Sequence, residues 1–372
     1  MTRGAYIARL DLDEPHLAGV VRKITAQRAA LAVAGLPSTF YAMRSGAIVS
    51  DADEMRPAGG GALDRRLAHY LYFHRTVARD LGGAAFLYLR FQGAGPGLLR
   101  LLSRFRARNP RAPILMEIPT WPYRGERHGP RQHVLGLLDD LSAPHLHRYV
   151  DRIVTFSGEE RILGIPTIRT RNGVDLASIP VAPTRRPQPP LRLVAVANLG
   201  VRHAYDRMID GLARYRAAGY TREILFDVIG SGAAGPGLQA LAQQRGVADM
   251  VHFPGPMNGP ALDERMGQAH MGIAALGMHR IKADTSDLKS REYCARGLPF
   301  LTSNPDADFP DDCPFVLRAS ADDSPIDIAA VVAFLDGRDH DSRAIRQHAE
   351  THLTWHAKMA PVVDWLHARG AA

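Results

Sequence analysis

Short β-rich apolar runs alternate with amphipathic helical stretches along the first half of the chain. The short runs favour strands, and the longer stretches place apolar residues at helical spacing. The predicted elements of this half are Ala5–Leu10, Val20–Ala34, Ser38–Met43, Leu63–Leu81, Ala85–Phe91, Leu98–Arg108, Pro113–Ile118, Arg131–Arg148 and Arg152–Phe156. Such an alternation predicts a parallel sheet with helices on both faces.

A proline-rich stretch, Pro180–Pro190, precedes a second series of the same kind. Its composition predicts an extended linker between two domains. The second series consists of Leu191–Ala197, a helix from Tyr205, Glu223–Ile229, Gly237–Arg245, Met250–Phe253, Ala261–Ala269, Met271–Ala274, Lys289–Ala295 and Phe300–Thr302. The chain is therefore predicted to form two tandem doubly wound α/β domains, residues 1–180 and 181–354, with a cleft between them.

The end of the chain carries a further helical pattern, interrupted by a proline. Met359, Val362 and Leu366 share one helical face on either side of Pro361. Proline inside a helix removes a hydrogen bond and is best tolerated in a first turn. We therefore predict a kinked C-terminal helix whose second part starts at Pro361.

Composition narrows the class of protein. The 372 residues are 46% apolar, and this length is typical of two domains that each bury a core. The two cysteines, Cys294 and Cys313, are too few for a Cys-rich metal site, and we interpret them as free thiols in a reducing compartment. Neither a signal peptide nor an apolar run of about 18 residues is apparent. We expect a cytoplasmic protein that does not span a membrane.

The net positive charge lies entirely in the N-terminal half. Residues 1–180 hold 25 Lys and Arg against 16 Asp and Glu, a net charge of +9, whereas the remainder has a net charge of −1. Such a field favours an anionic partner. Within Leu98–Arg108 an apolar face lies opposite Arg100 and Arg104, which fits a core-packed helix with a solvated face, or contact with an anionic membrane surface. Nucleic acid is not expected, because no recognition motif accompanies the charge.

Loops after the predicted strands are the places where ligands bind in such sheets. Gly19 opens the helix after the first strand, and Gly230 follows a strand of the second domain, so each could admit an anion or a nucleotide, or simply make a turn. The segment from Ala283 to Pro299 predicts a loop followed by a helix. Its N-terminus and Lys289 suit a diphosphate and Glu292 suits ribose hydroxyls, while an ordinary capped helix remains the alternative.

This last segment resembles the donor-binding E-x7-E segment of retaining, group-1 glycosyltransferases of the GT-B fold. The resemblance extends to Gly19–Ile24, Glu117–Tyr123, Asn172–Asp175 and Val196–Gly200, and so spans nearly the whole chain. It implies a GT-B fold whose C-terminal helix, within residues 355–372, crosses back to the first domain. It also implies that Glu292 holds the donor ribose, that N–H groups around Leu288 and Lys289 hold the diphosphate, and that Gly230 walls the nucleotide pocket.

The sequence departs from this family at the diphosphate site. Asn198 and His203 stand where the family usually has an Arg and a Lys, so Arg202, Lys289 or Arg280 would have to substitute. The first acid of the E-x7-E segment is shortened to Asp284, which reaches about one methylene less far toward the sugar. The predicted donor site therefore consists of Gly19, Asn198, Arg202, His203, Gly230, Arg280, Leu288, Lys289 and Glu292.

The first domain is expected to bind the acceptor. Candidates for catalysis are Glu117 and His128, together with Asp284 of the second domain, and candidates for acceptor contacts are Thr120, Tyr123 and Arg127. His133 could face the acceptor as well. Ordinary loop and helix roles for these residues remain equally open.

The resemblance implies transfer of a sugar from a nucleotide-sugar to a glycan or lipid-linked glycan, with retention, as in bacterial surface polysaccharide synthesis. No metal or other cofactor is expected, although three D-x-D strings occur, at Asp11–Asp13, Asp51–Asp53 and Asp306–Asp308. The alternatives are a sugar-nucleotide 2-epimerase of the same fold and, less favoured, a basic nucleic-acid-binding protein.

Overall fold

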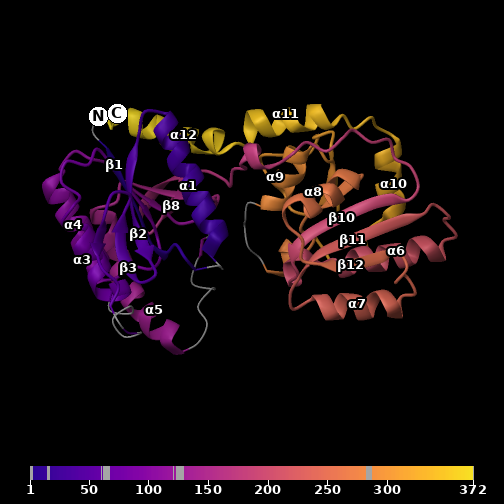
Figure 1. The fold of residues 1–372 in the computed structure, drawn as a ribbon, viewed down its shortest axis with the longest axis horizontal. Helices are drawn as coiled ribbons and strands as arrows, with labels where there is room; N and C mark the ends of the chain where they lie inside the picture. Colours follow the sequence, from indigo (N-terminus) through magenta and orange to yellow (C-terminus); the bar gives the residue numbers. More distant parts are fainter. Residues whose placement is uncertain are drawn as a thin grey trace. The chain divides into compact units, whose positions relative to one another are not determined.

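The computed structural model describes residues 3–14, 17–59, 61, 68–119, 121–122, 130–281 and 287–371. The chain divides into two compact units (Figure 1). The first unit combines Met1–Arg171 with Lys358–Ala372, and the second is Asn172–Ala357.

The first unit is built on a nine-stranded sheet of order β4-β3-β2-β1-β5-β6-β7-β9-β8. The six strands from β2 to β9 in this order pair in parallel, and β3, β4 and β8 add antiparallel edges. The strands are β1 (Gly4–Asp11), β2 (Ser38–Arg44), β3 (Ala47–Ser50), β4 (Glu54–Arg56), β5 (Leu87–Arg90), β6 (Ile114–Glu117), β7 (Arg152–Thr155), β8 (Arg161–Ile162) and β9 (Ile165–Arg169).

Helices cover this sheet, and α4 buries one apolar face on it. Leu98, Leu101, Leu102 and Phe105, which form the apolar stripe of α4, are all buried, so the core-packed interpretation of this helix is correct. The helices of the unit are α1 (Ala18–Val33), α3 (Phe73–Val77), α4 (Pro96–Arg108), α5 (Pro130–Ser142) and α12 (Trp355–His367).

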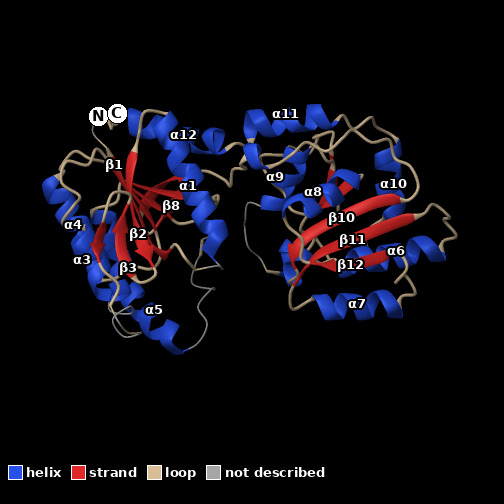
Figure 2. Ribbon diagram, viewed as in Figure 1, coloured by secondary structure: helices blue, strands red, loops and turns tan. Residues whose placement is uncertain are grey.

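The second unit has a wholly parallel six-stranded sheet of order β12-β11-β10-β13-β14-β15. Figure 2 shows α6 and α7 on one face and α8 and α9 on the other. The strands are β10 (Leu191–Asn198), β11 (Ile224–Ser231), β12 (Val251–Gly255), β13 (Met271–Ile273), β14 (Phe300–Thr302) and β15 (Val316–Arg318). The helices are α6 (Asp206–Ala217), α7 (Gly235–Gln244), α8 (Gly259–Gln268), α9 (Leu288–Arg296), α10 (Ile328–Asp336) and α11 (Ser342–His352). The prediction of two doubly wound sheets is confirmed.

The proline-rich stretch lies inside the second unit and does not join the two units. The chain passes between them at Arg171–Asn172 and again at Ala357–Lys358. The backbone N–H of Ala182 donates to the carbonyl of Arg296 at 2.7 Å, and the guanidinium of Arg185 donates to the carbonyl of Gly267 at 2.6 Å. Proline limits the conformations of this stretch, but these bonds hold it on the second unit.

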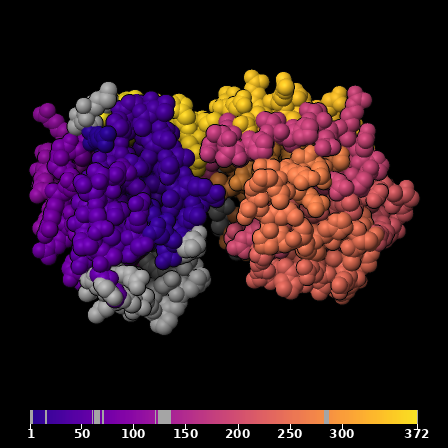
Figure 3. Space-filling model, viewed as in Figure 1, coloured from indigo at the N-terminus to yellow at the C-terminus, as the bar shows by residue number. Residues whose placement is uncertain are grey.

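The C-terminal helix returns to the first unit. Thr170 Oγ1 donates to the carbonyl of Lys358 at 2.5 Å, and the Arg152 guanidinium lies 5.3 Å from the ring centre of Trp365. Figure 3 shows C-terminal residues in yellow on the unit that also carries the indigo N-terminal residues. The predicted second start at Pro361 is wrong, because α12 runs through this proline as one helix. In the described part of the chain, no helix is both long and apolar enough to cross a bilayer.

Candidate functional site

The strand order of the second unit marks one place for a ligand. The order reverses between β10 and β13, and in parallel sheets ligands bind at the carboxyl ends of strands beside such a reversal. The loops that leave these two strands are joined to each other. Leu276 N–H donates to the carbonyl of His203, and Gly277 N–H donates to the carbonyl of Arg202, both at 3.1 Å. Residues 198–206 and 274–280 are thus joined to each other, and together we call them the rim.

The two glycines at the end of β11, Gly230 and Gly232, are required by the neighbouring backbone. Gly230 has φ +127°, and a Cβ there would lie 1.9 Å from the carbonyl oxygen of Ala197. Gly232 has φ +154°, and its Cβ would lie 2.3 Å from the carbonyl oxygen of Leu199. Only glycine fits such close approach at these angles. Gly230 thus lets Ala197 of β10 lie close to the end of β11, and this role needs no ligand.

His203 is the least exposed polar residue of this rim. Its side chain is buried, and its Nδ1 accepts the backbone N–H of Gly200 at 3.1 Å. An acceptor carries no proton, so in the neutral ring the proton is on Nε2. Nε2 has no hydrogen-bond partner among the residues that the structure describes. A buried donor left unpaired costs about 1–3 kcal/mol, so such a group is exceptional in a folded protein.

The surroundings keep this imidazole neutral. Burial, together with the positive charges of Lys289 and Arg202, lowers the pKa of His203 to about 4, and Asp287 opposes the shift. Its ring also stacks on that of Tyr205, with ring centres 5.6 Å apart. At neutral pH His203 therefore offers one N–H donor and no charge.

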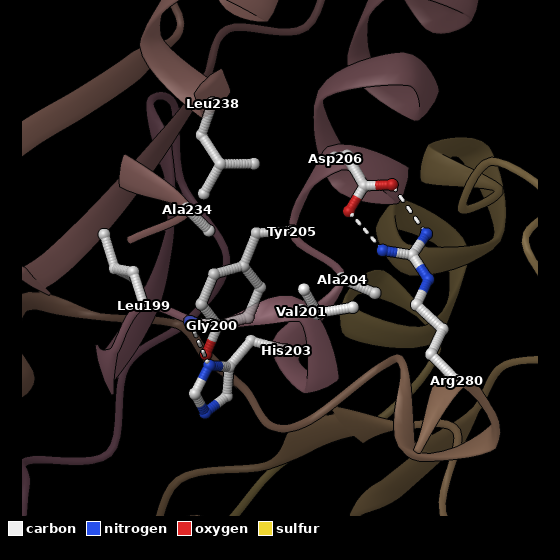
Figure 4. Close-up of a pocket in the computed structure, with 10 residues that line it drawn as sticks. All are labelled: Leu199, Gly200, Val201, His203, Ala204, Tyr205, Asp206, Ala234, Leu238 and Arg280. Carbon is white, nitrogen blue, oxygen red and sulfur yellow. Dashed lines mark hydrogen bonds and ion pairs between the residues drawn. The ribbon is translucent and has the colours of Figure 1, made fainter. Parts of the chain in front are cut away.

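A pocket of about 120 Å³ lies beside this rim (Figure 4). Leu199, Ala234 and Leu238 give it an apolar side, and Arg280 with Asp206 closes the other side. The Arg280 guanidinium donates to both carboxylate oxygens of Asp206, at 2.9 and 2.6 Å, and to Asp323 at 2.7 Å. Arg280 thus already holds two carboxylates, which leaves it less able to substitute for a diphosphate-binding cation.

Helix α9 begins beside His203. Its N-cap is Asp287, whose carboxylate accepts the N–H of Lys289 at 3.3 Å and the hydroxyl of Ser290 at 3.2 Å. The Lys289 ammonium lies 3.8 Å from the same carboxylate. One of the N–H groups expected to hold a diphosphate is therefore occupied by the cap, as in an ordinary capped helix.

The other donor-site candidates of the second unit lie on exposed parts of these elements. Leu288 and Glu292 are exposed on α9, and Asn198 and Arg202 are exposed on the rim after β10. Asp284 lies outside the described residues. The structure thus brings these candidates to three strand ends and one helix start within one unit: Asn198, Arg202 and His203 at the end of β10, Gly230 at the end of β11, Arg280 after β13, and Leu288, Lys289 and Glu292 in α9.

The third D-x-D string serves an ion pair inside the fold. Arg291 of α9 is fully buried, and its guanidinium donates to Asp306 at 2.8 and 3.2 Å and to Asp308. It also donates to the carbonyls of Asn172 and Asp287, each at 2.8 Å. A buried guanidinium with this set of acceptors holds the N-terminal turn of α9 in place. These two carboxylates therefore have a structural role.

In each of the other two D-x-D strings the first carboxylate is bonded to protein groups. Asp11 accepts the N–H groups of Ser45 and Gly46, each at 2.9 Å. Asp51 pairs with Arg28 and accepts the N–H of Phe40 at 2.8 Å. Among the residues that the structure places, no cluster of three His, Cys, Asp or Glu side chains is arranged to hold a metal ion.

Glu117 lies at the carboxyl end of β6 in the first unit, inside a buried polar cluster. Its Oε1 is 2.6 Å from the Lys23 ammonium and 3.1 Å from the Arg90 guanidinium. Its Oε2 accepts the hydroxyl of Tyr88 at 3.2 Å, and the Tyr6 ring stacks on Tyr88. The cluster therefore joins the ends of β5 and β6 to helix α1.

These contacts keep Glu117 ionised. Burial alone would raise the pKa of Glu117, but the charges of Lys23 and Arg90 lower it below 4.5. Burial lowers the pKa of Lys23 in turn, and the nearby carboxylate counteracts this. A carboxylate stabilised by two cations is a weak base. The arrangement therefore suits Glu117 to hold Lys23 and Arg90 in place better than to abstract a proton.

The remaining candidates of the first unit are placed only in part. Gly19 lies in the first turn of α1, and no described atom lies within 4 Å of where its Cβ would be, so packing does not require glycine there. Thr120, Tyr123, Arg127 and His128 lie outside the described residues, as does the side chain of His133.

Sequence reasoning missed three side chains that shape these sites. Arg90 and Tyr88 were read only as parts of a strand, although Arg90 stands directly at its end, which was a usable signal. Arg291 sits inside the segment that resembles the donor site, but nothing in the sequence shows that it pairs with Asp306.

Comparisons with known proteins give fold likeness without sequence likeness. No protein-family model and no curated protein matches the chain. Among solved structures, sucrose-phosphate synthase from Thermosynechococcus elongatus has a TM-score of 0.62 at 12% identity, covering 99% of this chain and 100% of that one. A glycosyltransferase from Rickettsia africae has a TM-score of 0.63 at 10% identity, covering 98% of each chain.

A third similar structure was solved with a nucleotide. Anabaena HepE in complex with UDP has a TM-score of 0.59 at 9% identity, covering 99% of this chain and 100% of that one. Full coverage of both chains means that both units, in the same order, are shared with these proteins. The chain therefore has the fold of the GT-B glycosyltransferases, two parallel-sheet α/β units in tandem with a C-terminal helix that returns to the first.

Proposed function

We propose that this protein is a glycosyltransferase that moves a sugar from a nucleotide-sugar to a glycan or lipid-linked glycan, with retention of the anomeric configuration. The observation that carries the proposal is the rim of the second unit. There the ends of β10 and β13 lie side by side at the strand-order reversal, next to a helix start that carries Lys289 and Glu292. This is where a parallel sheet binds a nucleotide.

The chemistry of the rim supports a nucleotide-sugar donor. A departing nucleoside diphosphate needs positive charge and N–H donors, which Arg202 and His203 after β10 and Lys289 at the start of α9 supply within one unit. Glu292, exposed one turn into α9, suits ribose hydroxyls. The Anabaena protein of similar fold was also solved with UDP and glucose, which makes UDP the first nucleotide to test.

The first unit is proposed to bind the acceptor. Its net charge of +9 over residues 1–180 favours an anionic acceptor, such as a glycan on a lipid diphosphate at the inner face of a bacterial cell membrane. The buried cluster of Lys23, Arg90 and Glu117 stands at the carboxyl edge of its sheet and fixes two cations there. Bacterial surface polysaccharide synthesis, at a cytoplasmic location, is the setting that this acceptor would suit.

The proposed reaction relies on electrostatics and positioning. The donor sugar passes through an oxocarbenium-like state while the diphosphate leaves, and fixed donors at that diphosphate lower the barrier. Retention is proposed to follow from attack on the face that the diphosphate leaves, with the diphosphate taking the acceptor's proton. No metal cofactor is invoked, because one carboxylate of each D-x-D string, that of Asp11, Asp51 or Asp306, accepts hydrogen bonds from protein groups.

A thermal-shift screen over UDP-, GDP-, ADP- and dTDP-sugars tests the donor. A ligand that binds the folded state raises the melting temperature by mass action. The stabilising donor is then incubated with and without candidate acceptors, and the products are read by NMR. Acceptor-dependent product with the donor's anomeric configuration supports the proposal. Conversion of the donor without any acceptor would identify an epimerase, and stabilisation by none of these compounds would exclude the donor class.

A further inference from the structure

The sheet of the first unit has a strand-order reversal of its own, between β1 and β5. β2 pairs with β1 on one side, whereas β5 pairs with it on the other side and leads on to β6, β7 and β9. Ligands of parallel sheets bind at the carboxyl ends of the two strands beside such a reversal. Arg9 lies near this end of β1, and its guanidinium donates to the carbonyl of Gln92, just after β5, at 3.0 Å. The Arg9 side chain thus reaches from one strand end to the other.

Helix α4 begins in the loop that follows β5. Residues 93–97 read Gly-Ala-Gly-Pro-Gly, and the N-cap, Gly95, has no side chain with which to cap the helix. In the described part of the chain, no group accepts the backbone N–H of Gly97 or of Leu98 in the first turn. A Cβ on Gly93 or Gly95 would meet no atom within 4 Å, so the loop is open on these sides. Free N–H groups at the positive end of a helix favour an anion.

His74 of α3 meets this helix start from the neighbouring helix. Helices α3 and α4 lie side by side (Figure 1), and Arg108 donates to the carbonyl of Ala78 at 2.9 Å. The His74 side chain is only 8% exposed, and its Nδ1 lies 3.3 Å from where a Cβ of Gly97 would be. Neither ring nitrogen hydrogen-bonds to a residue that the structure describes, yet neither is sealed from solvent. Because an imidazole buried to this extent usually has a partner, His74 is arranged to meet one from outside the chain.

The groups around the ring indicate an anionic partner. Burial and the nearby Arg9 and His69 lower the pKa of His74 to about 3, so at neutral pH the ring is uncharged and offers one N–H donor. Asp139 of α5 also reaches this loop, but it accepts the N–H of Ala94 at 2.6 Å, before the N-cap, and leaves the first turn of α4 unoccupied. A guanidinium, an imidazole N–H and helix N–H groups together suit the several oxygens of a phosphate group.

We propose that the first unit binds a phosphate group of a lipid-linked acceptor at the start of α4, through the N–H groups of Gly97 and Leu98 and an N–H of the His74 ring. Arg9 supplies positive charge beside it. This proposal rests on the proposed function for the acceptor and adds to it a subsite for the acceptor's anionic end. Free inorganic phosphate shares the same chemistry, and the experiment separates the two sources.

Two substitutions disturb the subsite without breaking a hydrogen bond of the fold. His74→Leu keeps a similar side-chain volume and deletes the imidazole. Gly97→Ala places a methyl group 3.3 Å from Nδ1 of His74, so that the ring has to shift, while alanine favours the helix. Gly237→Ala is the matched control, because α7 begins with the same Gly-Pro-Gly sequence and a Cβ on Gly237 would meet no atom within 4 Å.

The measurement is calorimetric titration with geranyl diphosphate, geraniol and inorganic phosphate, in excess UDP so that the proposed donor site is filled. Geranyl diphosphate should bind the wild type more tightly than inorganic phosphate does. His74→Leu should weaken its binding about tenfold, because a hydrogen bond to a charged group is commonly worth that much. Gly97→Ala should weaken it several-fold, and Gly237→Ala should match the wild type. Geraniol lacks the phosphates, so its affinity should not change in any variant, and neither should that of UDP.

The outcomes distinguish this subsite from the proposed function. If neither phosphate probe binds the wild type, or if His74→Leu and Gly97→Ala bind them as the wild type does, the inference is overturned, while UDP binding by the same samples leaves the proposed function intact. If phosphate probes bind and depend on His74 while no nucleoside diphosphate binds, the subsite stands and the proposed function fails.

Two further results decide the source of the phosphate and guard against a folding defect. Inorganic phosphate that binds as tightly as geranyl diphosphate, with the same dependence on His74, would identify free phosphate as the occupant and overturn the assignment to the acceptor. Melting curves establish that the variants fold. Should His74→Leu not fold, Gly97→Ala, which keeps every polar side chain, decides alone, and wild-type affinity in that variant would overturn the inference.

Discussion

At the scale of single residues, a strand-end position alone does not determine the chemistry of a side chain. Glu117 stands at the end of β6, where catalytic acids often lie in such sheets, and the sequence alone suggested that role. Its partners Lys23 and Arg90 come from α1 and β5, 94 and 27 positions away in the chain, and no local pattern announces them. The ionisation of a buried group depends on such distant neighbours, which is why the sequence predicted the position of Glu117 but not its state.

Replacing Glu117 tests this buried pairing. Glu117→Gln leaves two cations without their carboxylate, so we expect a loss of about 3–5 kcal/mol of unfolding free energy at pH 7. The pKa of Glu117 is lowered in the folded state, so its contribution is present above 4.5 and is lost as the pH falls through the folded value. Urea unfolding should therefore show a difference between variant and wild type that is constant above pH 5 and shrinks in acid.

The control for this experiment is Glu160→Gln. Glu160 is exposed, and its backbone carbonyl, rather than its carboxylate, accepts the N–H of Thr167. Its replacement should change stability by less than about 0.5 kcal/mol. An equally small effect of Glu117→Gln would contradict the pairing.

Glu292 gives the residue-scale test of donor binding. Glu292→Ala should weaken UDP-sugar binding about tenfold or more and abolish transfer, because it removes a charged acceptor for the ribose hydroxyls. The side chain is exposed on α9, so the melting temperature should stay close to that of the wild type. Isothermal titration with the donor decides the matter, and an unchanged affinity would remove Glu292 from the site.

At the scale of elements, the sequence predicted most of the second unit well because its strands are buried on both faces. Runs such as Leu191–Asn198 are apolar and short, and glycines mark their ends. Pro361 was misjudged for a physical reason. Its ring disturbs one hydrogen bond, yet Met359, Val362 and Leu366 are all buried, and this packing keeps α12 continuous.

Helix α9 depends on the ion pair between Arg291 and Asp306. In sequence, Asp306 belongs to a D-x-D string, which is the pattern of a metal site. Asp306→Asn should lower the unfolding free energy by about 3 kcal/mol, because buried Arg291 keeps Asp308 but loses a bidentate partner. Transfer should persist in EDTA for both the wild type and the variant. Asp312→Asn, which changes an exposed acid nearby, is the control for stability. Activity that EDTA removes and Mn²⁺ restores would return Asp306 to the metal-site interpretation.

At the scale of the whole molecule, the charge of the first unit predicts reversible membrane contact. Arg100 and Arg104 are exposed on α4, whereas Arg106 pairs with Asp151 and Arg108 donates to the carbonyl of Ala78. The first two are therefore available to lipid without any cost in folding. Each basic residue near an anionic surface contributes about 1 kcal/mol, so the double variant to Gln should lose about 30-fold in vesicle binding.

Flotation with vesicles of phosphatidylglycerol and phosphatidylcholine measures this effect. The wild type should float at low salt and be released at high salt, since the Debye length falls to about 3 Å at 1 M. The pair Arg214→Gln and Arg343→Gln removes the same charge from exposed positions of the second unit and should float like the wild type. A wild-type protein that stays in the bottom fraction of the gradient at low salt would contradict membrane contact.

The chain crosses between the two units twice, and this has a consequence for expressing each unit alone. Within the first unit Thr170 and Lys358 are hydrogen-bonded, and within the second the N–H of Val174 donates to the carbonyl of Leu353 at 2.8 Å. Residues 172–357 thus behave as an insert whose two ends meet, spliced into a host whose cut ends also meet.

We therefore expect the inserted residues 172–357 to form a cassette, meaning a segment that folds alone and can be exchanged as one piece. We expect residues 172–357, expressed alone, to fold and to bind UDP with an affinity close to that of the full chain, which calorimetry would measure. The host, rejoined by a short glycine bridge from Arg171 to Lys358, should fold as well. Swapping the cassette for that of another GT-B protein would then exchange the sugar that is delivered while keeping the molecule that receives it.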